Sequence, residues 1–394
     1  MPAERRLLWA ISFHHLCNDG TLMALVALIP VLKDQMNISY YDVGLLGLGL
    51  LVTVVVQYAV GSYADKHFSR YLLEVGAALM AVSFALLLLV NDFTGIFTVV
   101  IVMRVGAAFY HPVGISWITR AFGGTTLDTA LGIQSGVGNL GVIVALASSG
   151  FLGETFTWKV PCVLWAVLNM AAVIGGLIAI RETGLRPPDS SKREAISPLA
   201  TFRKIGLLAV PIVCGGALYQ VSSYFGPLSL TGRGGWTPGS ADLVFAIWIG
   251  IGTITSYSYG RISARIDRGT ILKQAYLVSL VSVILLGLVS AWYLVTPVLV
   301  LFGAFLYLTY PALFAIVTAA TEEDERGTAF GILFGFQLGG GAATVYVCGI
   351  VSKLLGDPAY SFDVVAVLTA VSVASFIIWD RNKKGVAARA GDSV

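Results

Sequence analysis

Ionisable side chains lie in the middle of two long apolar segments, where a charge needs a partner or a task. Asp19 is about twelve residues into the first segment, with Asn18 beside it and His15 four residues earlier on the same face of a helix. Arg104 is about eleven residues into the fourth segment, and His111 follows seven residues later on nearly the same face. An unpaired charge at the centre of a bilayer costs at least ~2.5–3.5 kcal/mol. We therefore expect these side chains to line a water-accessible cavity that binds protons or an anionic solute.

Asp19 is the residue that we predict to carry a coupling proton. Burial disfavours its ionised form and a nearby Arg104 would favour that form, so the two effects together can make protonation respond to physiological pH. We predict that His15 and Arg104 tune this proton-coupling site. A structural alternative stays open, in which Asp19 and Arg104 only pair to hold two helices together and His15 is a packing residue.

The same cluster and several later residues form a predicted binding site for a small molecule. Arg104 and His111 favour a substrate with an anionic group, because a guanidinium binds carboxylates and phosphonates well. Neutral polar and aromatic residues of the later segments suit the opposite wall, although packing is the alternative role for any single tyrosine. The predicted substrate-binding residues are Asn18, Arg104, His111, Gln134, Asn139, Tyr219, Gln220, Tyr224, Tyr310 and Gln337.

Other kinds of chemistry lack their usual motifs in this sequence. It contains no nucleophile elbow, no phosphate-binding Gly-Lys-Ser/Thr motif and no zinc-ligand cluster. We therefore predict no enzyme activity, no metal and no cofactor. The four cysteines fall inside apolar segments and are expected to be small packing residues without disulfides.

The composition requires a membrane around these segments. Of 394 residues, 57% are hydrophobic and 12% charged, with a mean hydropathy of +0.83; soluble domains carry about twice that charged fraction. Strands of a membrane barrel would alternate in polarity, which these segments do not, so helices are predicted. No cleavable signal peptide is predicted, because the first segment is too long and contains Asp19. We predict an all-α membrane protein with twelve transmembrane helices, at about 7–32, 42–64, 71–90, 93–122, 126–153, 158–181, 202–230, 240–263, 270–292, 295–320, 325–354 and 360–380.

The chain uses one unit twice. Residues Thr129–Ile133 recur as Thr328–Ile332, and Pro112 recurs as Pro311 at the same offset of 199. Repeats of six membrane helices are common in secondary transporters, where the substrate binds between the repeats. The predicted domains are an N-terminal six-helix bundle at 1–181, a cytoplasmic linker at 182–200, a C-terminal six-helix bundle at 201–381 and a cytoplasmic tail at 382–394.

The orientation follows from lysine and arginine. If the N-terminus is inside, the inner loops and termini hold 20 of the 25 basic residues and the outer loops hold four. This asymmetry predicts that both termini are cytoplasmic. The net charge of +3 thus reflects membrane topology and does not indicate nucleic-acid binding. The expected partners are a small-molecule substrate, protons and the lipid bilayer of the cytoplasmic membrane, and we expect a monomer.

The loop after the second predicted helix reads Gly61-Ser-Tyr-Ala-Asp65-Lys66-His-Phe-Ser-Arg70. It resembles the loop motif of the major facilitator superfamily, in which this loop latches the two halves in one state. The resemblance implies that Gly61, Asp65, Lys66 and Arg70 form a conformational latch. At the repeat offset Ala264 replaces the acid, so we expect little from the second copy. An ordinary polar turn is the alternative.

Three further motifs refine the resemblance. Ser12–Asp19 with its His-x-x-Asn-Asp pattern, Phe109–Pro112 and Gly138–Gly141 are similar to the fosmidomycin-resistance-like subfamily. That subfamily implies a secondary transporter, often for drug export. Exporters of the superfamily often carry Gly-Pro late in the fifth helix, whereas this chain has Val142–Ala147 there.

The sequence thus predicts a transporter that moves a small organic, anionic or drug-like solute by alternating access, as proton-coupled efflux or antiport. A proton-coupled uptake carrier or a uniporter is the alternative within this class. A receptor on a transporter scaffold and a membrane enzyme are alternatives from other classes.

Overall fold

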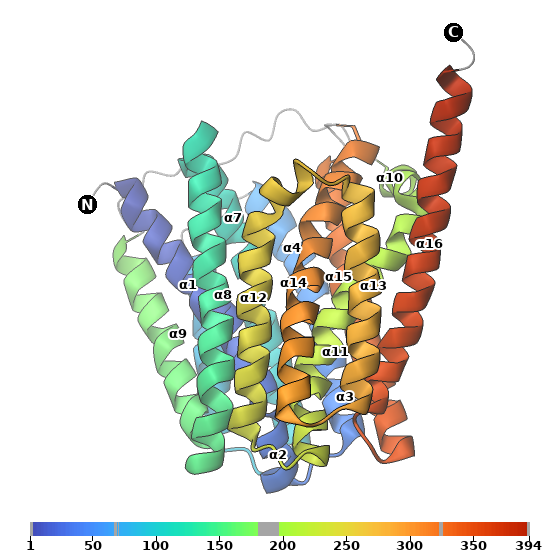
Figure 1. Ribbon diagram of the computed structural model, residues 1–394. Helices are drawn as coiled ribbons and strands as arrows, with labels where there is room; N and C mark the ends of the chain where they lie inside the picture. Colours follow the sequence, from blue (N-terminus) through green and yellow to red (C-terminus); the bar gives the residue numbers. More distant parts are fainter. Residues whose placement is uncertain (1–2, 67–68, 70, 180–196, 323–325, 392–394) are drawn as a thin grey trace. The chain divides into compact units, whose positions relative to one another are not determined.

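The computed structural model describes residues 3–66, 69, 71–179, 197–322 and 326–391, and the secondary structure of these residues is helical throughout (Figure 1). The helices are α1 (Ala3–Ala27), α2 (Ile29–Met36), α3 (Tyr40–Leu48), α4 (Leu50–Lys66), α5 (Leu72–Leu87), α6 (Phe93–Ala107), α7 (Tyr110–Ala121), α8 (Gly124–Thr155), α9 (Lys159–Ala179), α10 (Pro198–Ile205), α11 (Ala209–Arg233), α12 (Pro238–Ser263), α13 (Arg268–Leu288), α14 (Trp292–Ala320), α15 (Arg326–Leu355) and α16 (Tyr360–Gly391). A 3₁₀ turn at Gly206–Leu208 joins α10 to α11.

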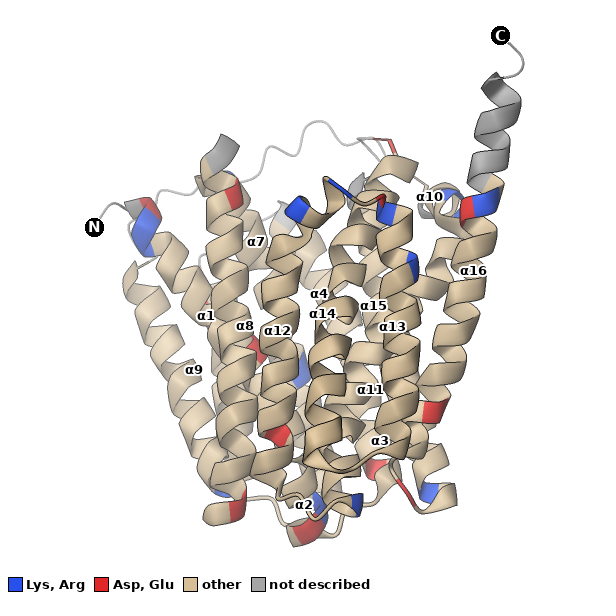
Figure 2. Cartoon of the chain, viewed as in Figure 1, with Lys and Arg blue, Asp and Glu red and all other residues tan. Residues whose placement is uncertain are grey.

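These helices confirm the predicted all-α membrane fold. Among the described residues, ten helices are long and apolar enough to cross a membrane, and the pair α1 and α2, bent by 42°, would make eleven. The shorter apolar helix α5 occupies the position of the third predicted span. The prediction of twelve spans is consistent with this order. Figure 2 shows charged residues gathered near helix ends with few along the helix lengths, as a membrane interior requires.

Two predicted spans are interrupted helices. The second span consists of α3 and α4, which meet at Gly49, and the fourth consists of α6 and α7. Between α6 and α7, the amides of Ala108 and Phe109 bond to carbonyls only three residues back. Pro112 explains this break, because it has no N–H to offer the Ala108 carbonyl and its ring clashes with that oxygen.

The chain separates into two compact units. The first contains residues 1–193 and 230–249, and the second contains residues 194–229 and 250–394. The predicted linker falls largely outside the described residues, which resume at 197, and α16 continues into the predicted tail as far as Gly391. The predicted domain boundaries stay a prediction.

In the first unit, α1 packs against α8 and α9, and α5 packs against α6 and α9; Figure 1 shows α1, α8 and α9 side by side. The contact between α1 and α8 is close because Gly141 lies against the backbone of Leu16: a Cβ at Gly141 would be 2.2 Å from the Leu16 carbonyl oxygen. In the second unit Gly340 of α15, 199 residues later, lies against the side chain of Val213 of α11, with its Cβ position 2.6 Å from Cγ1 of Val213. The sequence repeat is therefore also a repeat of helix packing.

Candidate proton and substrate site

The break between α6 and α7 brings an aromatic ring and an imidazole to α1. Tyr110 and His111 are the first two residues of α7, and both lie against His15 of α1. The rings of His15 and Tyr110 are stacked with centroids 4.4 Å apart, and the ring of His111 meets His15 edge-on at 5.3 Å. The helical spacing within α1 and the turn before Pro112 together assemble this cluster.

Asp19 has three polar partners. Its Oδ2 lies 3.0 Å from Nε2 of His15, and its Oδ1 lies 3.5 Å from Nε2 of His111. Asn18 donates from Nδ2 to Oδ1 of Asp19 at 2.9 Å. The side chain of His111 is 38% exposed and that of Asp19 is 22% exposed, whereas His15 is buried. Solvent can therefore reach the cluster from the side of His111.

The hydrogen bonds of His15 require a proton between His15 and Asp19. Nδ1 of His15 lies 2.9 Å from the backbone carbonyl of Gln134, which can only accept, so Nδ1 carries the hydrogen. A neutral imidazole then presents a lone pair at Nε2, and an ionised Asp19 would present another lone pair 3.0 Å away. That contact is favourable only if His15 is an imidazolium or Asp19 is protonated. In either form the pair holds one proton more than a neutral histidine beside an ionised aspartate.

Gln134 of α8 connects the cluster to a second hydrogen-bond chain. Tyr110 donates from its hydroxyl to Oε1 of Gln134 at 2.8 Å, and Gln134 donates from Nε2 to Oγ of Ser135 at 3.1 Å. Gln134 and Asn18, both predicted as substrate-binding residues, thus lie beside the predicted proton residues. The sequence prediction missed Tyr110, although its place between Phe109 and His111 in the Phe-Tyr-His-Pro motif was a usable signal.

Arg104 is buried in α6, but it is not a partner of Asp19. The hydroxyl of Thr53 in α4 donates to the backbone carbonyl of Arg104 at 3.1 Å. The two histidines and Asn18 occupy the positions around Asp19 that the sequence suggested for the guanidinium. Asn139, another predicted substrate residue, is half-buried on α8.

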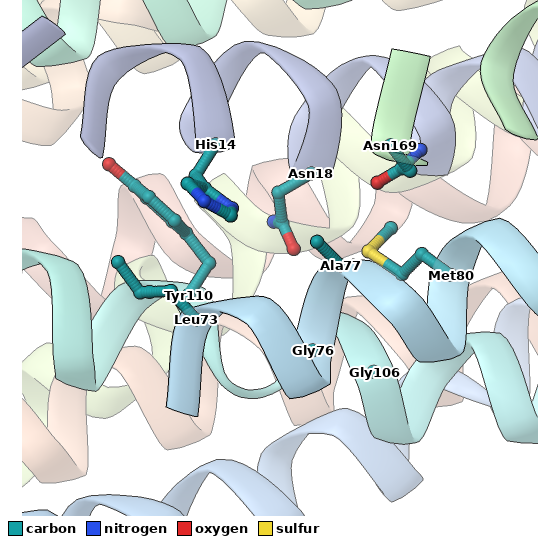
Figure 3. Close-up of a pocket in the computed structure, with 9 residues that line it drawn as sticks. All are labelled: His14, Asn18, Leu73, Gly76, Ala77, Met80, Gly106, Tyr110 and Asn169. Carbon is teal, nitrogen blue, oxygen red and sulfur yellow. The ribbon is translucent and has the colours of Figure 1, made fainter. Parts of the chain in front are cut away.

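A small, mainly apolar cavity shares Asn18 and Tyr110 with the cluster (Figure 3). Its volume of ≈ 10 Å³ is about what one water molecule needs. His14 and Asn169 line it, and Nε2 of His14 and Oδ1 of Asn169 are buried without a hydrogen-bond partner among the described residues. The lining residues are His14, Asn18, Leu73, Gly76, Ala77, Met80, Gly106, Tyr110 and Asn169.

The candidates of the second unit form an aromatic group. Tyr219 and Tyr307 meet edge-on at 6.4 Å, and Tyr307 meets Tyr310 edge-on at 5.6 Å. The hydroxyl of Tyr310 donates to the carbonyl of Gly215 at 3.4 Å. Tyr307 is the link that the predicted set lacks. Of the other predicted residues, Gln220 and Gln337 are half-buried and Tyr224 is fully buried.

The predicted latch lies at the end of α4. Gly61 is in the helix and faces α7, with its Cβ position 3.4 Å from Cβ of Pro112. Asp65 and Lys66 are the last two residues of α4, but their side chains, and the whole of Arg70, lie outside the described residues.

One group of side chains has the composition of a metal site. Ligand atoms of His15, Asp19 and His111 lie within 4.8 Å of one another, and two imidazoles with a carboxylate are a donor set that transition metals accept. The contacts of Asp19 at 3.0 and 3.5 Å are also those of charge-assisted hydrogen bonds, for which a proton suffices.

Comparisons with known proteins agree with this architecture. The chain is 23% identical over 361 residues to the fosmidomycin resistance protein of Escherichia coli strain K12, covering 88% of this chain and 86% of that protein. The crystal structure of nucleoside transporter NupG superposes with a TM-score of 0.77 at 15% identity, covering 97% of this chain and 99% of that one. The POT family transporter PepTSo superposes with a TM-score of 0.78 at 12% identity, covering 96% and 98%.

The similarity to solved structures shows the fold, and the family is shown by the sequence. The model of the Major Facilitator Superfamily matches residues 11–345 and again 235–393, which is most of the chain. The chain therefore belongs to the Major Facilitator Superfamily, and it is a multi-pass transporter of the cell membrane.

Proposed function

We propose that the protein is a proton-coupled secondary transporter of a small organic solute, and that His15, Asp19 and His111 form its proton site. The proton that the contact between His15 and Asp19 requires carries this proposal. Asp19 is partly exposed and its bond to His111 is the longer one, so this is the side where a proton or a solute can exchange. On the other side of Asp19, His15 is buried and is held in place by its hydrogen bond to the Gln134 carbonyl.

The substrate that suits this site has an anionic group. When Asp19 is protonated, it no longer needs the imidazole N–H of His111, and that donor is free for a carboxylate, phosphate or phosphonate. The relative from Escherichia coli is named for fosmidomycin resistance, which supports export and makes fosmidomycin the first probe.

The direction of transport depends on how proton and solute share the cluster. If proton and solute bind alternately to the same site, an inward proton gradient drives efflux. We propose efflux because the relative from Escherichia coli is named for fosmidomycin resistance. If the anion binds to the protonated cluster, the same gradient drives uptake, and the freeing of His111 by protonation of Asp19 favours this second candidate.

Proteoliposomes with an imposed pH gradient test coupling and direction together. Labelled fosmidomycin should move against its own gradient when a proton gradient is present, and the sign of that movement separates efflux from uptake. Flux that equals the rate without a gradient would make the protein a uniporter for this solute. Metal analysis of the purified protein is the control: a stoichiometric transition metal that stays bound would contradict a proton at this cluster.

A further inference from the structure

A second carboxyl group of the first unit is buried far from the cluster on α1. Asp242, in the second turn of α12, is fully buried, and neither of its carboxylate oxygens has a hydrogen-bond partner among the described residues. Oδ2 points at the backbone of α8: a Cβ at Gly150 would lie 2.0 Å from it. The carboxyl group thus occupies the space between two helices that a side chain at position 150 would need.

Glycines on both helices allow this close crossing. Gly150 of α8 faces Asp242, and Gly239 of α12 faces Phe151, whose Cα is 2.8 Å from the Cβ position of Gly239. Glu154, one turn beyond Gly150, accepts from the Gly239 amide at 2.8 Å and from the Thr237 hydroxyl at 3.2 Å. The α8–α12 contact, formed by Gly150, Phe151 and Glu154 on α8 and by Thr237, Gly239 and Asp242 on α12, therefore contains two carboxyl groups in different roles.

Only one of these carboxyl groups is placed to be ionised. Glu154 is at the N-terminal end of α12, where a backbone N–H and the helix dipole stabilise a negative charge. Among the described residues Asp242 has no hydrogen-bond donor and no ion pair, it is fully buried, and the negative charge of the nearby Glu154 repels a second one. The contact as it stands therefore accommodates Asp242 only in its protonated form.

The other charged residues at this end of the first unit do not offset the cost of burying an ionised Asp242. Lys33 and Asp34 of α2, Lys159 of α9 and Arg233 of α11 lie at the ends of helices, and Asp242 has no ion pair or hydrogen bond with any of them. Lys159 instead donates to the carbonyl of Leu88 at 2.8 Å. Separation of α8 from α12 would admit water to Asp242 and let it ionise.

We propose that Asp242 is a second proton-binding site, and that a proton on Asp242 closes the contact between α8 and the start of α12. In the predicted topology this contact faces the outer side of the membrane. An acidic exterior then favours the closed contact, and loss of the proton favours its opening. The site shares no residue with the cluster at Asp19, so the inference does not depend on the proposed function.

Spin labels on both sides of the contact test this proposal. Cysteines for labelling are placed at Phe156, just beyond α8, and at Gly234, before α12, both of which are exposed. In wild-type protein the distance between the labels, measured by electron paramagnetic resonance, should increase as pH rises from about 5 to 9. Asp242→Asn, which keeps the shape of the protonated acid, should hold the short distance over the whole range.

One control makes the result specific. Asp34→Asn removes an exposed carboxylate of the same unit and should leave the wild-type response unchanged. A label distance that does not depend on pH in the wild type, or a pH response that persists in Asp242→Asn, would overturn the proposal. Because the readout is a distance and not transport, failure of proton coupling at Asp19 would not alter it.

Discussion

Nε2 of His15 lies 3.0 Å from Oδ2 of Asp19, one turn further along α1, while Nδ1 of the same ring is bound to the Gln134 carbonyl. The second bond fixes which nitrogen carries the ring hydrogen, and this makes the first bond dependent on an added proton. This arrangement is the basis of the proposed proton site, and its geometry depends on Gln134 of α8. The partners of Asp19 therefore predict which pairs of substitutions should have non-additive effects on the unfolding free energy.

A double-mutant cycle can separate the partners of Asp19. His15→Gln and Asp19→Asn should be strongly non-additive in unfolding free energy, by about 0.5–3 kcal/mol, because each removes the same contact. Arg104→Ala and Asp19→Asn should be additive, since Arg104 is not a partner of Asp19. Thermal unfolding of the purified single and double variants provides the measurement. Non-additivity between Arg104 and Asp19 would support the direct pair that the sequence suggested.

Much of this cluster could be predicted from the sequence, and the reason is helical periodicity. His15 and Asp19 are four residues apart, so one turn of helix already brings them together. The choice between Arg104 and His111 as the partner of Asp19 could not be predicted, because it depends on the turn before Pro112 and on how α6 and α7 pack against α1. Sequence spacing places Arg104 and His111 on one face, and the break in the helix separates them.

The burial of Asp242 also could not be predicted from the sequence. An acid in the first turns of a predicted span is typical of helix N-termini, where it is ordinarily solvated. Its burial against Gly150 is a property of how two helices cross. Sequence reasoning located the helices and the repeat but had no information on that crossing.

Close packing of α1 on α8 predicts a pair of glycine substitutions with opposite effects. Gly141→Ala should destabilise the protein by ~1–3 kcal/mol, because the new methyl group would overlap the backbone of Leu16. Gly132→Ala, on the same helix, meets nothing within 4 Å and should stabilise it by ~0.5–1 kcal/mol. Melting temperatures in detergent compare the two variants. Equal melting temperatures would contradict the close approach of these helices.

The predicted latch should be asymmetric between the repeats. Asp65→Asn should slow transport while expression and melting temperature stay near wild type, because the change shifts the balance between conformations. Its loop follows α4, which packs against α7 and so against the helix that carries His111. Ala264→Asp should have a much smaller effect on the transport rate. Equal losses from both substitutions would argue against a latch in the first repeat alone.

Asp19→Asn tests proton coupling through Asp19 with two measurements. In proteoliposomes, Asp19→Asn should abolish solute flux driven by a pH gradient but keep exchange of labelled for unlabelled solute, because the amide retains the shape of the protonated acid. Asp34→Asn, at an exposed carboxylate of α2, should keep both activities. Loss of gradient-driven flux with exchange retained is the predicted result. Gradient-driven flux that persists in Asp19→Asn would contradict the assignment of the coupling proton to this residue.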